Sequence, residues 1–132
     1  MIIEDRYYEY GLQQMERAER EKKKYNGYKD KSERVCFYTG SNYAERHEVF
    51  YGKPDREISI AHGFQVDLHP EKHREIHENC TPWAKEENAK WKYVYERLYL
   101  DKLIGQDITE KMALRYWMNL IRWNYIEELM PE

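Results

Sequence analysis

The sequence predicts an α+β fold in which a small β-hairpin and a short helix lie between one N-terminal helix and two long C-terminal helices. Residues 4–24 and 81–132 show helical periodicity, whereas residues 34–68 contain short β-prone runs separated by glycine and proline. Hydrophobic residues make up 41% of the 132 positions and aromatic residues 15%. This content is enough to bury one compact core and too high for a disordered chain.

The first segment, residues 4–24, is expected to form a charged helix. Tyr8, Leu12 and Met15 follow the spacing i, i+4, i+7 and predict a narrow apolar stripe. Beyond Met15 the run is almost wholly charged, which is typical of a solvated helix with ion pairs four residues apart. A nucleic-acid contact through its lysines is the alternative. Asn26-Gly27 predicts the turn that closes the segment.

The middle of the chain is expected to alternate strands and short helices. β-Branched and aromatic residues predict strands over residues 34–38, 47–51 and 64–68. A short helix over residues 55–61 should end at Gly63. Pro70 suits the first turn of a further helix, which should run to about Asn79.

Two helices are predicted in the last 50 residues. Thr81 can cap the first of them, which should end near Gly105. One face of this helix carries four aromatic residues and a leucine: Trp83, Trp91, Tyr95, Leu98 and Tyr99. Asp107 and Glu110 resemble a capping box at the start of the second helix. We expect that helix to bury Met112, Tyr116, Leu120, Trp123 and Ile126.

Composition excludes several classes of protein. No apolar run reaches transmembrane length, and the first residues lack the apolar stretch of a signal peptide. The two cysteines, Cys36 and Cys80, do not make a disulfide framework, so we expect a protein of the reducing cytoplasm. Residues 35–80 carry five Lys or Arg against eight Asp or Glu, a balance of −3. Such a balance is unfavourable for binding the phosphates of a nucleic-acid backbone.

Histidines form the clearest functional pattern. All five lie between positions 47 and 77: His47, His62, His69, His73 and His77. On a helix, His73 and His77 would face the same side about one turn apart. His47, on a neighbouring strand, could offer a third imidazole. Three imidazoles favour zinc or another divalent transition metal over Mg²⁺ or Ca²⁺, so we predict a metal site made by these three residues.

The fourth ligand of this site stays open, with Cys80, His69, Glu48 and water as the alternatives. The alternative to the whole site is that these histidines have no ligand role.

Local residues in the same region resemble a known family, the HNH nucleases encoded by many phages. The resemblance is carried by Cys36-x-x-Thr39-Gly40, Glu45-Arg46-His47-Glu48-Val49-Phe50-Tyr51-Gly52, Arg56, Ser59, Gly63, Val66, Leu68, His73 and His77, and more weakly by Asn124-Tyr125-Ile126. It implies a ββα-metal core over residues 34–80, in which a hairpin carries one ligand and a helix carries two. Residues 1–33 would then be an additional charged helix, and residues 81–132 a helical hairpin packed on the core.

The chain departs from this family at the catalytic positions. The family has a histidine base directly after the hairpin ligand, and here that position is Glu48. Glutamate, with a pKa near 4.3 against about 6.5 for imidazole, is the weaker base at neutral pH unless it is buried. The family's central Asn should fall near Phe64, and the closest substitute, Gln65, should point to the opposite face of its strand.

Relatives in the family often hold a second, structural zinc through two Cys-x-x-Cys pairs. The corresponding positions here are Cys36 and Thr39, then His69 and Lys72. Because a lysine ammonium has no lone pair, we expect this second site to be lost.

Our leading hypothesis is a catalytically impaired, metal-binding protein that acts by binding another protein. The metal would stabilise a small core, and the many tyrosines suit a protein interface. Carboxylates such as Glu71, Glu75 and Glu78 could compete for the basic channel of a nucleic-acid-binding nuclease. With the family resemblance, this suggests a phage-encoded inhibitor of a host nuclease, of the anti-CRISPR type.

The alternative hypothesis is an active HNH endonuclease that cleaves DNA phosphodiester bonds. The metal would polarise the scissile phosphate, Lys53 or Arg56 would contact it, and Glu48 would be the catalytic base. A third hypothesis is a helical cytoplasmic protein that binds no metal.

Overall fold

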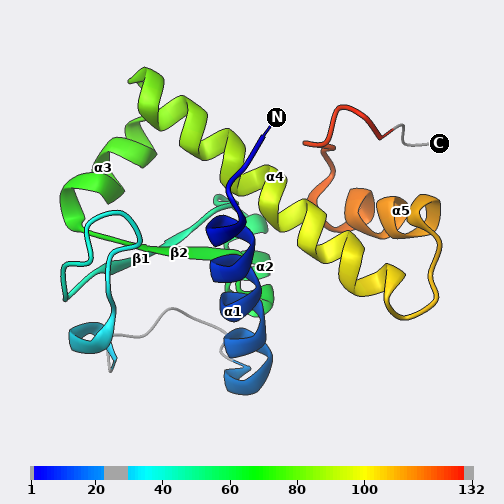
Figure 1. Cartoon of the computed structure of the whole chain (residues 1–132), viewed down its shortest axis with the longest axis horizontal. Coiled ribbons are helices and arrows are strands. Elements are labelled where there is room, and N and C mark those ends of the chain that lie inside the picture. The colour runs from blue at the N-terminus through cyan, green and yellow to red at the C-terminus, as the bar shows by residue number, and fades with distance from the viewer. Residues whose placement is uncertain (1, 23–29, 130–132) are drawn as a thin grey trace.

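The computed structural model describes residues 2–22 and 30–129 and has the expected α+β fold (Figure 1). Its elements are α1 (Asp5–Glu21), the 3-10 turn η1 (Lys31–Glu33), β1 (Glu45–Glu48), α2 (Asp55–His62), β2 (Gln65–Leu68), α3 (Pro70–Glu78), α4 (Pro82–Ile104) and α5 (Glu110–Ile121). No helix in these described ranges is both long and apolar enough to cross a bilayer.

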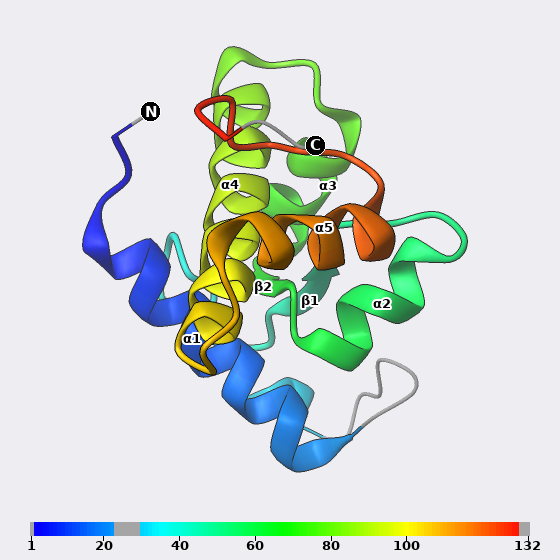
Figure 2. The same ribbon diagram turned by 90° about the vertical axis from the view of Figure 1, so that its right-hand side faces the viewer.

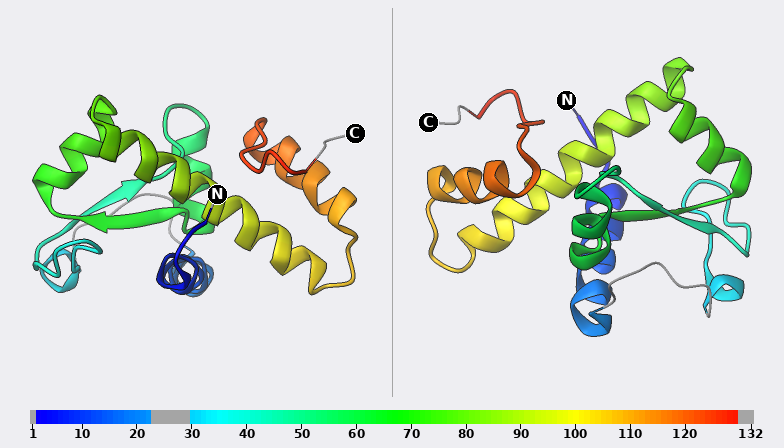
Figure 3. Two further views of the ribbon diagram at one scale, coloured as in Figure 1. Left: turned by 45° about the horizontal axis from the view of Figure 1, so that its top comes forward. Right: turned by 180° about the vertical axis from the view of Figure 1, so that it is seen from behind.

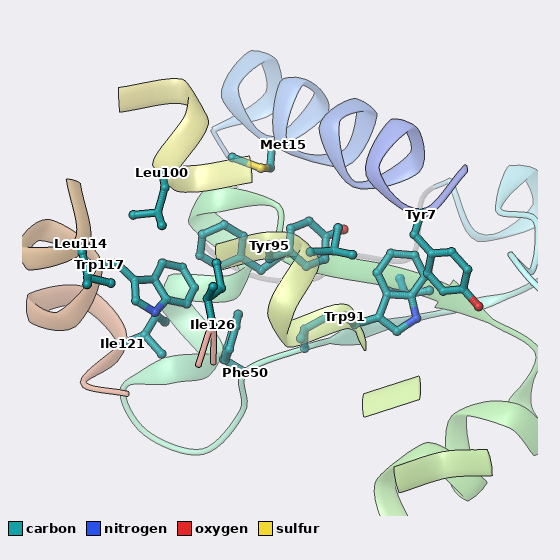
Figure 4. Packing of buried hydrophobic residues seen from close by; sticks show 14 of the residues in the cluster. Tyr7, Met15, Phe50, Trp91, Tyr95, Leu100, Leu114, Trp117, Ile121 and Ile126 are labelled. Carbon is teal, nitrogen blue, oxygen red and sulfur yellow. The ribbon is translucent and has the colours of Figure 1, made fainter. Parts of the chain in front are cut away.

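The long helix α4 runs through the molecule, and the helices α1, α3 and α5 pack along it (Figures 1 and 3). The two strands and α3 lie toward its N-terminal half, α5 lies along its C-terminal half, and α1 crosses near its middle. One hydrophobic core therefore draws side chains from the N-terminal helix, the strands and both C-terminal helices (Figure 4).

β1 and β2 pair in antiparallel register, with His47 opposite Val66 and Glu45 opposite Leu68. β1 ends at Glu48, earlier than predicted. Val49 N–H still donates to the Phe64 carbonyl, but Phe50 bonds to α2 instead of a strand. The hydroxyl of Ser59 on α2 accepts from the Phe50 N–H at 3.1 Å and donates to the Phe50 carbonyl at 2.6 Å.

The predicted strand over residues 34–38 is wrong: the segment makes one isolated bridge, between Val35 and Asn42. Cys36 N–H donates to the carbonyl of Ser41, and Gly40 N–H donates to the carbonyl of Cys36. These bonds fold the segment back on itself as a turn, so its β-prone side chains pack without forming a ladder.

The buried face of α1 differs from the predicted stripe. Tyr7, Gly11, Met15 and Ala18 are buried, whereas Leu12 is exposed. A Cβ atom at Gly11 would lie 2.8 Å from Leu98 Cδ1, so the missing side chain allows α1 to approach α4 closely. The helix ends at Glu21, before the predicted end, and the turn expected at Asn26-Gly27 lies outside the described residues.

α2 ends at Gly63, as predicted, and this glycine has a positive φ of 77°. A Cβ atom here would clash with the backbone carbonyl of Gln14 on α1. Gly63 therefore serves both the left-handed helix end and the close packing of α1 against α2.

The start and the buried face of α5 also differ from the prediction. Thr109, not Asp107, caps the helix, because its hydroxyl accepts from the backbone N–H of Met112 at 3.2 Å. The buried side chains are Ala113, Leu114, Trp117 and Ile121 (Figure 4). Met112, Tyr116 and Trp123, which were expected in the core, are exposed, although Ile126 is buried as predicted.

Candidate metal centre

Three imidazoles from two elements meet beside the paired strands. His47 is on β1, and His73 and His77 lie one turn apart on α3. The His47 Nδ1 and His77 Nε2 atoms are 3.3 Å apart, and the Nε2 atoms of His73 and His77 are 3.0 Å apart. All candidate donor atoms lie within 4.8 Å of one another. These three residues are close enough to hold one metal ion.

Two of the three nitrogen separations match those of a tetrahedral centre. Zinc–nitrogen bonds of about 2.0–2.1 Å at tetrahedral angles place two ligand nitrogens roughly 3.3 Å apart. Two of the three nitrogen separations lie near that value, and the third is within 4.8 Å. The donor set of three nitrogens fits a late transition metal and does not fit Mg²⁺ or Ca²⁺, which prefer oxygen.

A local cap and a bond to α4 fix the two ends of α3. His69 caps the helix, since its Nδ1 accepts from the backbone N–H of Glu71, and Pro70 follows in the first turn. At the other end, the Asn88 amide on α4 donates to the Ile76 carbonyl at 2.9 Å. These contacts define both ends of the helix that carries His73 and His77.

Desolvation keeps two of the three imidazoles uncharged. His47 is buried, and desolvation, helped by the neighbouring His77 and His73, lowers its pKa well below the usual value. Burial and His73 also lower the pKa of His77. Both rings are therefore neutral at pH 7, which is the form that binds a metal through a nitrogen lone pair.

Glu45 is a site residue that the sequence analysis missed. Its Oε1 lies 2.9 Å from His73 Nδ1, so this ring can donate Nδ1–H to the carboxylate and turn the Nε2 lone pair toward the other histidines. The signal was present in the sequence. Glu45 precedes His47 by two residues, and such residues share one face of a strand.

A pocket of about 330 Å³ opens beside the imidazoles. It is lined by Arg34, Glu45, Arg46, Glu48, Tyr51, Arg56, His73 and His77. The predicted base position thus faces the same space as two of the candidate ligands. The Glu48 side chain is only 9% exposed and accepts from Arg56 Nε at 3.0 Å, whereas the Arg56 side chain is 62% exposed.

The remaining predicted contact residues lie elsewhere. Lys53 is exposed in the loop between β1 and α2, and it is absent from the pocket lining, as are the three glutamates on α3. Of these glutamates, Glu75 accepts from the Thr81 hydroxyl at 2.7 Å, Glu78 lies 4.0 Å from Arg74, and Glu71 is exposed.

The positions that correspond to the family's central Asn do not reach the site. Phe64 is buried in the core, where its ring centroid is 5.7 Å from that of Trp117. Gln65 points to the other face of the hairpin, as expected, and its Oε1 accepts from Arg17 Nη2 on α1 at 2.6 Å.

Two of the alternatives for a fourth ligand have other roles. The Cys80 thiol donates to the Glu78 carbonyl, and His69 caps α3. At the position where the family would hold a second zinc, Lys72 Nζ lies 4.4 Å from the Trp83 ring centroid. Glu48 and water stay as candidates for the fourth position.

Comparisons of the chain with protein-family models, with curated proteins and with solved structures found no match. The function is therefore argued from the geometry of the site.

Proposed function

We propose that the chain is a metal-dependent phosphodiesterase of the ββα-metal kind that acts on nucleic acid. The observation that supports it is a three-imidazole site bordering a pocket that also contains a carboxylate and an arginine. Structural zinc sites normally have four protein ligands, whereas catalytic ones have three and leave a position for water or substrate. Zinc or a related divalent transition metal fits the donor set.

When bound, the ion would supply a positive charge that polarises a phosphoryl oxygen and stabilises the leaving oxygen. Side chains of the protein would bind the phosphate and accept a proton. Arg56 exposes its guanidinium at the pocket and suits a phosphate, which it can bind with two N–H donors. A phosphate bound there would compete with Glu48 for Arg56.

Glu48 would then be able to accept a proton from the attacking water. Its side chain lines the same pocket as two candidate ligands, His73 and His77. Even so, a carboxylate is a weaker base than the histidine of the resembling family. We therefore expect slow cleavage.

A binding protein without catalysis is the second candidate, and one observation favours it. Pocket arginines already lie against carboxylates: Arg34 Nη2 is 2.7 Å from Asp30 Oδ1, and Arg46 Nε is 2.8 Å from Asp67 Oδ1. These pairs reduce the positive charge available to a nucleic-acid backbone. In this case the metal would be structural and the partner a protein, such as the nucleic-acid-binding nuclease that an anti-CRISPR-type inhibitor would target.

One experiment separates the two candidates. The full chain, loaded in turn with Zn²⁺, Mn²⁺, Ni²⁺ and Mg²⁺, is incubated with supercoiled plasmid and with single-stranded DNA. We expect cleavage that is lost in His47→Ala and reduced in Glu48→Gln. His62→Ala, which changes a histidine outside the site, is the matched control and should cleave normally. Stoichiometric metal binding without cleavage of either DNA would overturn the phosphodiesterase proposal.

A further inference from the structure

The apolar stripe of α1 is only partly covered by α4. Leu12, one of the three residues of the predicted stripe, is 47% exposed. It borders a cavity of about 530 Å³ between the two helices, together with the buried Met15 and the half-buried Leu98 of α4. We call this cavity the α1–α4 groove. Its apolar side chains are therefore accessible from outside.

Two contacts between the helices bound the groove. Gly11 packs against Leu98 where α1 crosses α4 (Figure 2), and Glu19 Oε2 lies 3.5 Å from Lys102 Nζ farther along both helices. All lining residues fall within 12–19 on α1 and 98–102 on α4, from one contact to the other. Gly11 and Glu19 are eight residues apart, which corresponds to about 12 Å of helix. The groove is therefore one continuous surface with the length of roughly two helical turns.

Acidic side chains surround Leu12 on α1. Four of them are related to it by steps of three or four positions and therefore share its face of the helix: Asp5, Glu9, Glu16 and Glu19. All four are exposed, and Glu9 and Glu16 make no ion pair within the described residues. This face of α1 therefore carries uncompensated negative charge.

The lining of the groove has the same sign of charge. Three of its seven residues, Glu16, Glu19 and Asp101, are acidic, and one, Lys102, is basic. Asp101 is also paired with Arg97 at 2.9 Å, yet its side chain is 58% exposed. A partner that fits must present apolar side chains flanked by lysines or arginines, because complementary charges favour the encounter and like charges oppose it.

The backbone around the groove favours a helical partner. Both walls are helices, whose N–H and C=O groups are bonded internally, so an extended segment finds no strand edge to pair with. A helix satisfies its own backbone bonds and binds through side chains at i, i+3, i+4 and i+7. A second copy of this chain docked through the same face would bring two acidic faces together, which is unfavourable.

We propose that the α1–α4 groove binds a basic amphipathic helix of a partner protein. Leu12, Met15 and Leu98 would contact the apolar side of that helix, and the carboxylates around them would contact its lysines or arginines. The inference goes beyond the proposed function and does not rest on it, since no residue of the groove belongs to the metal site.

The test uses the full chain and a fluorescein-labelled synthetic peptide of leucine and lysine, with leucines spaced i, i+3, i+4 and i+7. Fluorescence anisotropy measures its affinity. We expect Leu12→Ala to weaken binding by about tenfold, because it removes a central apolar anchor. Val35→Ala is the matched control, since Val35 is 46% exposed and lies outside the groove.

The charged side chains are tested separately. The double variant Glu9→Gln/Glu16→Gln should weaken binding by about threefold or more and make it less dependent on salt. Its matched control is Glu57→Gln/Glu71→Gln, which removes two exposed carboxylates on α2 and α3. A peptide with glutamate in place of lysine should not bind. A scrambled peptide of the same composition should bind at least about tenfold more weakly, since it lacks an apolar face.

All substituted side chains are exposed, and circular dichroism checks that each variant folds. Equal affinity of Leu12→Ala and the wild type would overturn the inference, as would equal binding of the scrambled peptide, which indicates charge attraction alone. A dimer in sedimentation that Leu12→Ala dissociates would assign the groove to a second copy of the chain and would also overturn it. Peptide binding without DNA cleavage would contradict the proposed function alone.

Discussion

His73 Nδ1 lies 2.9 Å from Glu45 Oε1, and the same imidazole has its Nε2 atom 3.0 Å from that of His77. One ring therefore joins a carboxylate on β1 to the group of nitrogens that could hold an ion. A carboxylate behind a ligating histidine fixes the ring's tautomer and raises its basicity. We therefore expect metal affinity to depend on Glu45 of the strand as well as on the histidines of the helix.

Replacing Glu45 by Ala should weaken metal binding by about 10- to 100-fold, because His73 loses the group that orients it. Titration of the protein against a zinc chelator of known affinity measures the change. Glu71→Ala, on the exposed side of α3, is the control and should bind zinc like the wild type. Equal affinities of Glu45→Ala and wild type would show that the carboxylate does not support the site.

His77→Ala should lose metal and thermal stability together, since a bound ligand stabilises only the folded state. At zinc concentrations about 100 times the dissociation constant, that contribution is about 2.7 kcal/mol. Thermal melts with zinc and with a chelator, combined with elemental analysis, measure both quantities. The two proteins should melt closer together in chelator than in zinc, and a variant that keeps full metal content would remove His77 from the ligand set.

The helix that carries two candidate ligands could be predicted because its signals are local. Pro70 suits a first turn, and the spacing of His73 and His77 defines one face regardless of what packs on the other. The strand predicted over residues 34–38 failed because its β-propensity does not reveal the turn bonds of Cys36 and Gly40. Such bonds depend on the neighbouring loop and are invisible to a propensity scale.

Buried faces were harder to predict than helices. The stripe predicted for α1 contained only large side chains. It did not include Gly11 and Ala18, which are buried because α1 lies close to its neighbours. On α5 the error was of another kind: the predicted face was displaced by one residue, so that it included Tyr116, which is exposed, instead of the adjacent Trp117, which is buried. In the site, the three histidines could be found by residue type, whereas Glu45 required attention to strand alternation.

Glu48→His should increase the rate of DNA cleavage, because imidazole is the stronger base near pH 7. An acid–base residue typically contributes a factor of about 10²–10⁴, so a gain of about tenfold or more should be measurable in single-turnover assays. Glu48→Gln removes the base and should lower the rate. Metal content must stay constant in both variants. Equal rates in all three proteins would exclude a catalytic role for this position.

Glu96 on α4 should make folding stability depend on pH. Its side chain is buried, its Oε1 accepts from the Tyr125 N–H at 2.6 Å, and its Oε2 has no hydrogen-bond partner in the described part of the chain. Desolvation raises its pKa from 4.5 to about 7, against the smaller opposing effects of the Tyr125 N–H, Arg97 and the Trp117 indole.

Between pH 4.5 and 7 the unfolded chain has lost this proton while the folded chain keeps it, so stability falls as the pH rises through that window. Glu96→Gln removes the titration. The free energy of unfolding of the variant, relative to that of the wild type, should therefore rise by up to about 3 kcal/mol between pH 4.5 and pH 8. Urea unfolding in chelator measures this difference, because the histidines contribute equally to both proteins and cancel. A constant difference across the range would mean that the folded chain holds Glu96 ionised throughout.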